Sequence, residues 1–314
     1  MRVLVVCRYK EGMQDHAAPF VMEQMRALQA VGVECRLFLV KGKGFSVYLR
    51  QLKPLKQMIL DFRPEVIHAH YGLCGMLANL QRNVPVVTTY HGSDINSRAV
   101  LPFSRMAMRR SVWNIFVSRQ TMGIARLKKK CSLLPCGVDF SELQMTGRSA
   151  ARKKMNLDPG RHYVLFAGAF DNAVKNPSLA RQAVELLKEE QSVLLELKGY
   201  SREEVTLLMC AADALLMTSV NEGSPQVIKE ALACGCPIVS VDVGDVSERI
   251  TGVEGCYVAQ AREPQEIALL LDKAFAFGGK TKGREKIVSD GLENGQVARR
   301  LVKIYETIVY DGGC

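Results

Sequence analysis

Two glutamates, Glu222 and Glu230, stand with seven residues between them in NEGSPQVIKEALACGCPIVSVDVG, the segment at 221–244. Ser224 is a good N-cap and Pro225 suits the first helical position, so a helix is predicted to start there. From Pro225 to Glu230 this helix would rise about 7–8 Å, which is the reach from a bound phosphate to the hydroxyls of a ribose. Free N–H groups at a helix start bind anions, and a carboxylate further along can accept hydrogen bonds from a diol. The segment therefore predicts a nucleotide-sugar site.

Two further groups could complete such a site. Lys175 lies in FAGAFDNAVKN at 166–176, a predicted loop from which a lysine can reach a diphosphate as a point charge. His91 follows the strand predicted at 84–89, and ligands of open α/β sheets bind at the carboxyl ends of the strands. Asp94 either orients His91 or binds hydroxyls of an acceptor, and the sequence leaves both roles open.

Metal binding is not expected from the pattern of histidines and cysteines. His68 and His70, at the end of VIHAH, are expected to line the same cleft as His91, but no third credible zinc ligand accompanies them. The ten cysteines form no Cys-x-x-Cys pair, and only Cys234 and Cys236 are close in sequence. Reduced cysteines in the core of a cytosolic protein are the better account.

Predicted strands and helices alternate along the whole chain, which is the pattern of parallel α/β sheets. A polar linker is predicted at 140–160, so we expect domains at 1–140 and 141–295, with 296–314 as a C-terminal helix. The predicted strands lie at 2–7, 33–40, 66–69, 84–89, 113–117, 131–134, 162–167, 193–198, 214–218, 237–241 and 256–259. Besides the helix at Pro225, helices are predicted near 16–31, 46–61, 73–81, 98–111, 119–130, 177–190, 202–211, 264–277 and 297–309.

Charge is distributed unevenly along the chain. The formal net charge is +10, but residues 1–140 carry +13 and residues 141–314 carry −3. The basic helices predicted at 46–61 and 98–111 favour docking on an anionic membrane, with a merely soluble basic surface as the alternative. No apolar run approaches the ~20 residues of a membrane span, and the N-terminal residues are interpreted as a strand. We therefore expect a cytoplasmic protein, peripheral on the inner face of the membrane.

Several motifs resemble those of glycosyltransferase family 4, whose members are retaining enzymes. NEGSPQVIKEALACGCPIV, followed by GDVSE at 244–248, resembles the donor-site motif of the family's C-terminal domain. HGSD at 91–94 resembles the family's His-Gly-x-Asp element, and LPCGVD at 134–139 resembles the exit from its first domain. The resemblance covers most of the chain and is strongest at 162–250. It implies the α/β GT-B fold, two Rossmann-like domains facing each other across a cleft, with the C-terminal helix crossing back to the first domain.

The resemblance also implies a hexosyltransferase that takes a nucleotide diphosphate sugar as donor and needs neither a metal nor a cofactor. The implied catalytic residues are His91, against the donor sugar, Glu222, on the sugar hydroxyls, and Lys175, on the diphosphate. Glu230 would hold the ribose, and Asp94 and His70 would lie on the acceptor side. The full donor-binding set implied by the resemblance is Gly12, Gly168, Lys175, Glu222, Gly223, Ser224, Pro225, Gln226, Val227 and Glu230.

The sequence departs from the family pattern in three places. Gly12 stands alone where a Gly-Gly pair is usual, and Gly168 is followed by Ala169 where an arginine is usual. One leaving-group cation is therefore missing, so that either an arginine from elsewhere substitutes or the enzyme is slower. A strand-helix unit is absent between residues 199 and 213, which abbreviates the base pocket. Tyr200 is either a stacking partner for the base or an ordinary aromatic residue.

The expected reaction is transfer of a sugar to a glycan or lipid-linked acceptor in cell-surface polysaccharide or glycolipid biosynthesis. Because no pair of carboxylates flanks a sugar, a double displacement lacks its nucleophile, and the departing diphosphate is expected to take the acceptor proton. Two alternatives stay open. One is a nucleotide-sugar epimerase or phosphorylase of the same architecture, and the other is a non-enzymatic basic protein that binds glycan or nucleic acid. Nucleic acid is not expected as a partner, because aromatic residues are too few for a stacking platform.

Overall fold

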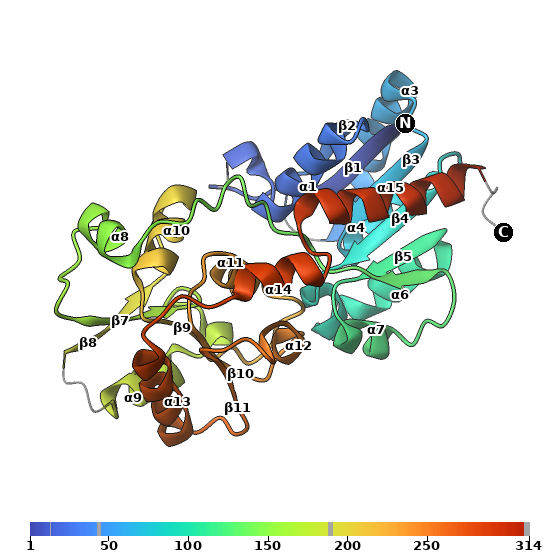
Figure 1. Cartoon of the computed structure of the whole chain (residues 1–314). Helices are drawn as coiled ribbons and strands as arrows, with labels where there is room; N and C mark the ends of the chain where they lie inside the picture. Colours follow the sequence, from blue (N-terminus) through green and yellow to red (C-terminus); the bar gives the residue numbers. More distant parts are fainter. Residues whose placement is uncertain (13, 43–44, 188–190, 311–314) are drawn as a thin grey trace. The chain divides into compact units, whose positions relative to one another are not determined.

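The computed structural model describes residues 1–12, 14–42, 45–187 and 191–310, and Figure 1 shows the whole chain. The chain divides into two compact units. Unit 1 consists of Met1–Gly137 with Leu292–Cys314, and unit 2 consists of Val138–Gly291. Unit 2 is therefore an insertion in unit 1, and the chain passes between the units twice.

The described residues of unit 1 form one parallel sheet with the strand order β2-β1-β3-β4-β5-β6. All five residues of β3 and of β4 are buried, which explains why these strands appear in the sequence as continuous apolar runs. The order turns between β1 and β3, since β2 lies on the far side of β1. The strands are β1 (Arg2–Arg8), β2 (Glu34–Val40), β3 (Val66–His70), β4 (Val86–Tyr90), β5 (Trp113–Phe116) and β6 (Cys131–Leu133).

Helices cover both faces of the sheet in unit 1. The C-terminal helix α15 (Asn294–Tyr310) packs beside α1 (Pro19–Ala30) on one face (Figure 1). On the other face, α4 (Gly72–Ala78) packs closely against α6 (Leu101–Arg110). The approach is possible because Gly72 has no side chain: a Cβ added there would lie 1.9 Å from Ser104 Oγ. The remaining elements are η1 (Gln14–His16), α2 (Phe45–Arg50), α3 (Leu52–Phe62), α5 (Ser93–Asn96) and α7 (Arg119–Ala125).

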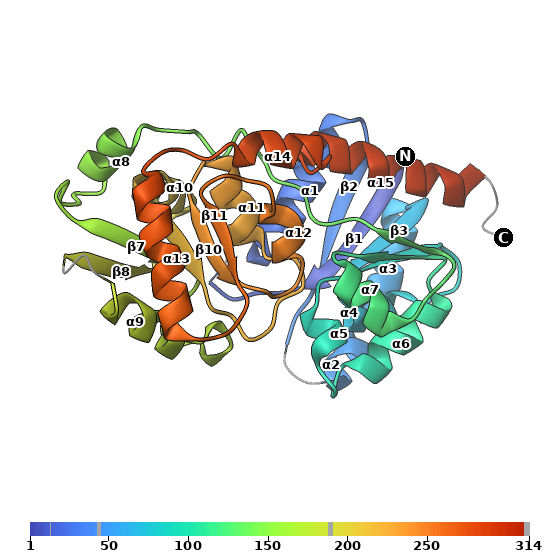
Figure 2. The same ribbon diagram turned by 60° about the horizontal axis from the view of Figure 1, so that its bottom comes forward.

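Unit 2 contains a second parallel sheet, which its described residues form in the order β11-β10-β9-β7-β8. Helices α9 and α13 pack together over one face, and α8 packs on α10 over the other (Figure 2). The strands are β7 (His162–Phe166), β8 (Ser192–Glu196), β9 (Ala214–Met217), β10 (Ile238–Val241) and β11 (Cys256–Ala259). The helices are α8 (Arg148–Lys154), η2 (Ala173–Lys175), α9 (Pro177–Glu185), α10 (Arg202–Ala211), α11 (Gln226–Ala233), α12 (Val246–Ile250), α13 (Pro264–Phe277) and α14 (Gly283–Ser289).

Two predicted features of unit 2 are wrong. The segment 140–160 is not a bare linker, because it contains α8, where Arg152 Nη2 donates to Asp213 Oδ2 at 2.7 Å. Ser224 is not the N-cap of α11, which begins two residues later at Gln226. The Ser224 hydroxyl instead donates to Asp245 Oδ2 at 2.9 Å, and this distant partner replaces the expected local bond.

Some predicted helices have different bounds in the structure. The helix predicted at 46–61 is two helices, α2 and α3, which meet at Gln51. The helix predicted near 177–190 is α9, which ends at Glu185, and residues 188–190 lie outside the described part of the chain. No helix among the described residues combines the length and the apolar composition that membrane crossing requires.

Candidate functional site

The carboxyl edge of the unit 2 sheet brings three loops together. Strands β7, β9 and β10 are neighbours and parallel, so the loops that follow them leave from the same edge. These loops carry Lys175, Glu222 and Asp245. The strand order turns between β7 and β9, because β8 lies on the far side of β7. Open α/β sheets bind ligands in the crevice at such a turning point.

Lys175 and Glu222 form an ion pair at this position. Lys175 Nζ lies 2.6 Å from Glu222 Oε1, and the two side chains are only 22% and 16% exposed. Thr218 Oγ1 lies 2.9 Å from the carbonyl oxygens of both Lys175 and Asn176. The loop after β7 and the loop after β9 are therefore joined by the charged pair and by the threonine.

Gly168 makes room for the stem of this lysine. A Cβ added at Gly168 would lie 2.6 Å from Lys175 Cγ, which is closer than real Cβ contacts. A larger residue here would displace Lys175, so Gly168 helps to position this lysine, and its donor-binding role stays a prediction.

Glu230 lies on α11 with 8% of its surface exposed. Arg202 Nη1 donates to Glu230 Oε1 at 2.7 Å. Arg202 starts α10, directly after Ser201, whose side chain caps that helix in a capping box with Glu204. Sequence reasoning missed Arg202, although its place at the abbreviated segment 199–213 was a signal to look for a cation there.

The expected phosphate-binding segment, residues 223–227, is supported from behind by the loop after β10. Gly244 has φ +64°, and a Cβ there would lie 2.7 Å from the Gly223 carbonyl oxygen and 3.3 Å from Glu222 Cβ. Asp245, 2% exposed, accepts the Ser224 hydroxyl and lies 3.2 Å from Arg249 Nε. Burial raises the pKa of Asp245, while the charges of Lys229 and Arg249 lower it.

In unit 1, His70 and His91 meet at the carboxyl ends of β3 and β4. His70 Nδ1 lies 3.0 Å from His91 Nε2, and His91 Nδ1 lies 3.8 Å from Cys136 Sγ. The His91 ring also contacts Phe20 and Tyr71, with ring centroids 4.7 Å apart in each case. Both ring nitrogens of His91 thus face groups of unit 1, and the ring would have to turn for either nitrogen to bond a sugar.

Buried hydrogen bonds hold His68 and His70 in place. His68 Nε2 lies 2.7 Å from Thr89 Oγ1, and His68 Nδ1 lies 2.6 Å from the hydroxyl of Tyr305 on α15. Burial lowers the pKa of His70 to about 3 and lowers that of His68 well below its usual value. Both imidazoles are therefore neutral near pH 7, and His70 is fully buried, so it lies behind His91.

Asp94 is buried and holds the backbone of the HGSD segment. Its Oδ1 accepts the N–H groups of His91 and Gly92 at 3.0 Å, and its Oδ2 accepts the N–H of Gly72 at 2.9 Å. Burial raises the pKa of Asp94 to about 6, although these bonds act to lower it. Of the two roles left open by the sequence, these contacts favour positioning of the backbone at His91.

Gly12 is exposed, with φ +76° and no atom within 4 Å of an added Cβ. Its positive φ, rather than close packing, is what favours glycine there. Tyr200, the candidate base-stacking residue, is 40% exposed. Among the residues that the structure describes, no three His, Cys, Asp or Glu side chains gather in a way that could hold a metal ion.

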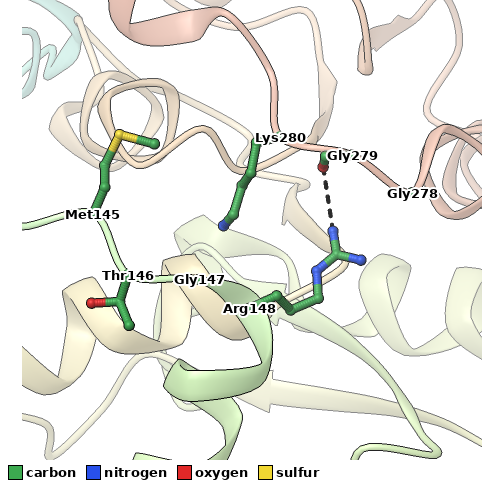
Figure 3. Close-up of a pocket in the computed structure, with 7 residues that line it drawn as sticks. All are labelled: Met145, Thr146, Gly147, Arg148, Gly278, Gly279 and Lys280. Carbon is green, nitrogen blue, oxygen red and sulfur yellow. Dashed lines mark hydrogen bonds between the residues drawn. The ribbon is translucent and has the colours of Figure 1, made fainter.

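Each unit also contains a pocket lined by two cations. In unit 2 a pocket of about 390 Å³ is lined by residues 145–148 and 278–280 (Figure 3). Its Arg148 donates to the Gly279 carbonyl and pairs with Asp213, and its Lys280 donates to the Cys210 carbonyl. In unit 1 a pocket of about 310 Å³ is lined by Arg8, Lys10, Tyr48, Tyr71, Leu73, Cys74, Ser93, Asp94, Ser97 and Val100.

Comparison with protein families finds one match in each half of the chain. Residues 2–142 match the model described as Glycosyltransferase Family 4, and residues 192–275 match Glycosyl transferases group 1. The chain belongs to glycosyltransferase family 4. The resemblance noted in the donor-site motif is thereby confirmed.

Relatives of this family 4 glycosyltransferase carry names that refer to different acceptors and products. The chain is 26% identical over 225 residues to the teichuronic acid biosynthesis glycosyltransferase TuaC of Bacillus subtilis, which covers 62% of this chain. It is 27% identical over 242 residues, 60% of this chain, to a D-inositol 3-phosphate glycosyltransferase of Pseudarthrobacter chlorophenolicus. The chain covers 57% of the length of each of these two relatives.

Solved structures confirm the predicted GT-B fold. Sucrose-phosphate synthase from Thermosynechococcus elongatus matches 98% of this chain, over 98% of its own length, with a TM-score of 0.85 and 16% identity. HepE from Anabaena, solved in complex with UDP-glucose, matches 98% of this chain over its whole length, with a TM-score of 0.76 and 15% identity.

Proposed function

We propose that this chain is a retaining hexosyltransferase that moves a sugar from a nucleotide diphosphate sugar to a glycan or lipid-linked acceptor. The product would enter cell-surface polysaccharide or glycolipid biosynthesis, the setting of TuaC. Unit 2 would bind the donor and unit 1 the acceptor.

The ion pair between Lys175 and Glu222 is the observation that carries the proposal. It lies at the turning point of the unit 2 sheet, with Lys175 Nζ 2.6 Å from Glu222 Oε1. When a donor enters, Lys175 would move its charge from the carboxylate to the diphosphate, which frees Glu222 to accept hydroxyls of the donor sugar. Glu230 would accept the ribose hydroxyls through the oxygen that Arg202 does not hold.

The chemistry would then depend on electrostatic stabilisation of the leaving group. Lys175 and the backbone N–H groups within 223–227 would offset the charge that develops on the diphosphate. The acceptor oxygen would attack the anomeric carbon from the face that the diphosphate leaves, and the diphosphate would take the acceptor proton. Ala169 stands where the family usually has an arginine, and Arg202 would supply a cation in its place, near the ribose.

Donor binding tests this assignment most directly. Thermal-shift screening with UDP-, GDP-, ADP- and CMP-sugars would select a donor, with UDP-glucose first because HepE binds it. In calorimetry, Lys175→Ala and Glu230→Ala should each weaken that donor at least tenfold. Unchanged binding in both variants would refute the assignment. Epimerisation of the donor without an acceptor would favour the alternative enzyme class.

We also propose that the chain binds peripherally to a membrane surface and transfers the sugar to its acceptor there. The basic helices α3 and α6 expose Leu60 at 67% and Met106 at 40% among lysines and arginines, a combination typical of interfacial helices. In sedimentation, the chain should bind vesicles with anionic lipid at low salt and bind less at high salt. No binding at either salt concentration would defeat this part of the proposal.

A further inference from the structure

The pocket in unit 1 lies where the strand order of its sheet turns. Arg8 ends β1 and Tyr71 follows β3, and these two strands are neighbours with β2 on the far side of β1. Ser93, which follows β4, adds a third loop from the same edge. This is the position at which open α/β sheets bind ligands, and a volume of about 310 Å³ falls at the lower end of the range of ligand pockets.

The charges of this pocket are unbalanced. Among the described residues, neither Arg8 nor Lys10 has a carboxylate within ion-pair distance, and Lys10 is half-buried. Asp94 also lines the pocket, but its two oxygens already accept three backbone N–H groups. The carboxylate is therefore already satisfied, and the two cations remain for a ligand.

Two tyrosines add neutral donors. Burial raises the pKa of Tyr48 to about 12 and raises that of Tyr71, so both phenols keep their protons near pH 7. Tyr71 has φ +72° and ψ +148°, a conformation that is costly for a residue with a side chain and that is typical of functional sites. Its ring contacts His91 at 4.7 Å, which joins the pocket to the HGSD segment.

The pocket of unit 2 in Figure 3 provides the contrast. It has a similar volume and also two cations, but Arg148 and Lys280 are both engaged by groups of the protein. A pair of lysine and arginine side chains is therefore not by itself a ligand site. The combination of unpaired cations, protonated phenols and a turning point of the sheet occurs in the pocket of unit 1.

From these observations we infer that Arg8, Lys10, Tyr48 and Tyr71 bind a phosphate group of the acceptor. The inference rests on the proposed function and names its acceptor class, a molecule that bears a phosphate monoester. The phosphate belongs either to a water-soluble polyol phosphate or to a polyprenyl phosphate, and the same four side chains would bind it in both.

Calorimetry on the full chain tests the pocket with defined probes. D-inositol 3-phosphate should bind at least tenfold more tightly than myo-inositol, which lacks the charge, and inorganic phosphate should compete with it. Arg8→Ala and Lys10→Ala should each lower the affinity for D-inositol 3-phosphate at least fivefold. Arg82→Ala, which removes an equal charge from an exposed site of unit 1 outside the pocket, should leave the affinity unchanged. Farnesyl phosphate, as a second probe, identifies the source: tighter binding of farnesyl phosphate indicates a polyprenyl acceptor.

Three outcomes would overturn the inference. Equal binding of inositol and its phosphate would remove the need for an anion site. An equal loss of affinity for the phosphate in Arg82→Ala would indicate a diffuse basic surface. Loss of nucleotide-sugar binding, instead of phosphate binding, in Arg8→Ala and Lys10→Ala would assign the two cations to the donor.

The selected nucleotide sugar is titrated into the same samples. Donor binding without phosphate binding defeats the pocket alone, whereas absence of donor binding in the parent chain defeats the proposed function.

Discussion

The two units differ in whether the cations at the carboxyl edges of their sheets are paired with carboxylates. In unit 2, Lys175 is paired with Glu222 at 2.6 Å and Arg202 with Glu230 at 2.7 Å. In unit 1, Arg8 and Lys10 line a pocket without a carboxylate partner among the described residues. Paired charges hold a site in shape before a ligand arrives, whereas unpaired cations attract an anion from outside. Under the proposed function, the donor site would be organised before the ligand arrives and the acceptor site would be open.

Substitution at Gly244 should break the organised site of unit 2 most severely. The added Cβ in Gly244→Ala would press on the Gly223 carbonyl at 2.7 Å and displace the loop that carries Glu222. Because a shift of about 1 Å in a catalytic group can lower the rate about 100-fold, we expect a loss of about that size in kcat. The measurement is steady-state turnover of the donor that the thermal-shift screen selects.

Gly252→Ala is the matched control for this variant. Gly252 has φ +81°, similar to Gly244, but no atom lies within 4 Å of its added Cβ. Both variants should lose about 1–2 kcal/mol of stability from the left-handed backbone, and only Gly244→Ala should lose kcat. Equal losses of kcat would mean that strain, and not displacement of Glu222, is responsible.

Removal of Arg202 should weaken donor binding by a smaller factor. Arg202→Ala leaves Glu230, 8% exposed, without this cation and removes a positive charge from the site proposed to bind a diphosphate. We expect donor affinity in calorimetry to fall about tenfold, which corresponds to about 1.4 kcal/mol.

The pair between Lys198 and Asp171 offers a comparison within the same unit. Its side chains are 54% and 67% exposed, and exposed pairs contribute about 0–1 kcal/mol. Lys198→Ala should therefore change donor affinity less than twofold. If Lys198→Ala weakens the donor as much as Arg202→Ala does, the effect comes from general charge and not from the contact with Glu230.

The buried histidines make the stability of unit 1 depend on pH. The folded pKa of His70, about 3, and that of His68 lie below the usual 6.5, so the unfolded chain takes up two protons that the folded chain refuses. Asp94 acts in the opposite direction between about pH 6 and pH 4, because its folded pKa of about 6 lies above the usual 3.8. One proton remains over this range, so the free energy of unfolding should fall by about 1.4 kcal/mol for each pH unit between about pH 6 and pH 4.

Urea unfolding can follow this effect through the single tryptophan, Trp113 in β5 of unit 1. His70→Gln removes one of the two histidines and leaves His68 and Asp94 to offset each other, so its unfolding free energy should change little between pH 6 and pH 5. A slope identical to that of the parent chain would show that His70 is not held neutral.

Local patterns were sufficient to predict most of the fold. Strand β11 and helix α13 have the predicted bounds, because apolar residues at the appropriate spacing and Pro264 define them within a few residues. Helix α8 was missed because RSAARKK has little apolar periodicity, and Arg152 is held instead by Asp213, 61 residues away. A long-range contact of this kind leaves no local signal.

The candidate site divides in the same way. The motifs pointed to Lys175, Glu222 and Glu230, and the structure brings Lys175 and Glu222 into contact. The motifs do not include Arg202, whose only signal was its place at the abbreviated segment 199–213. They also gave no indication that the His91 ring would face His70 and Cys136. These partners come from different elements, and only the order of strands in the sheet brings them together.

Helix α15 has a consequence for the order in which the chain folds during synthesis. Its Tyr305 is fully buried and contacts His68 in β3, so the interior of unit 1 is incomplete until α15 has left the ribosome. Unit 2, by contrast, is a continuous stretch of chain and can fold as soon as it emerges. Although most of unit 1 is synthesised before unit 2, unit 1 would therefore finish folding after unit 2.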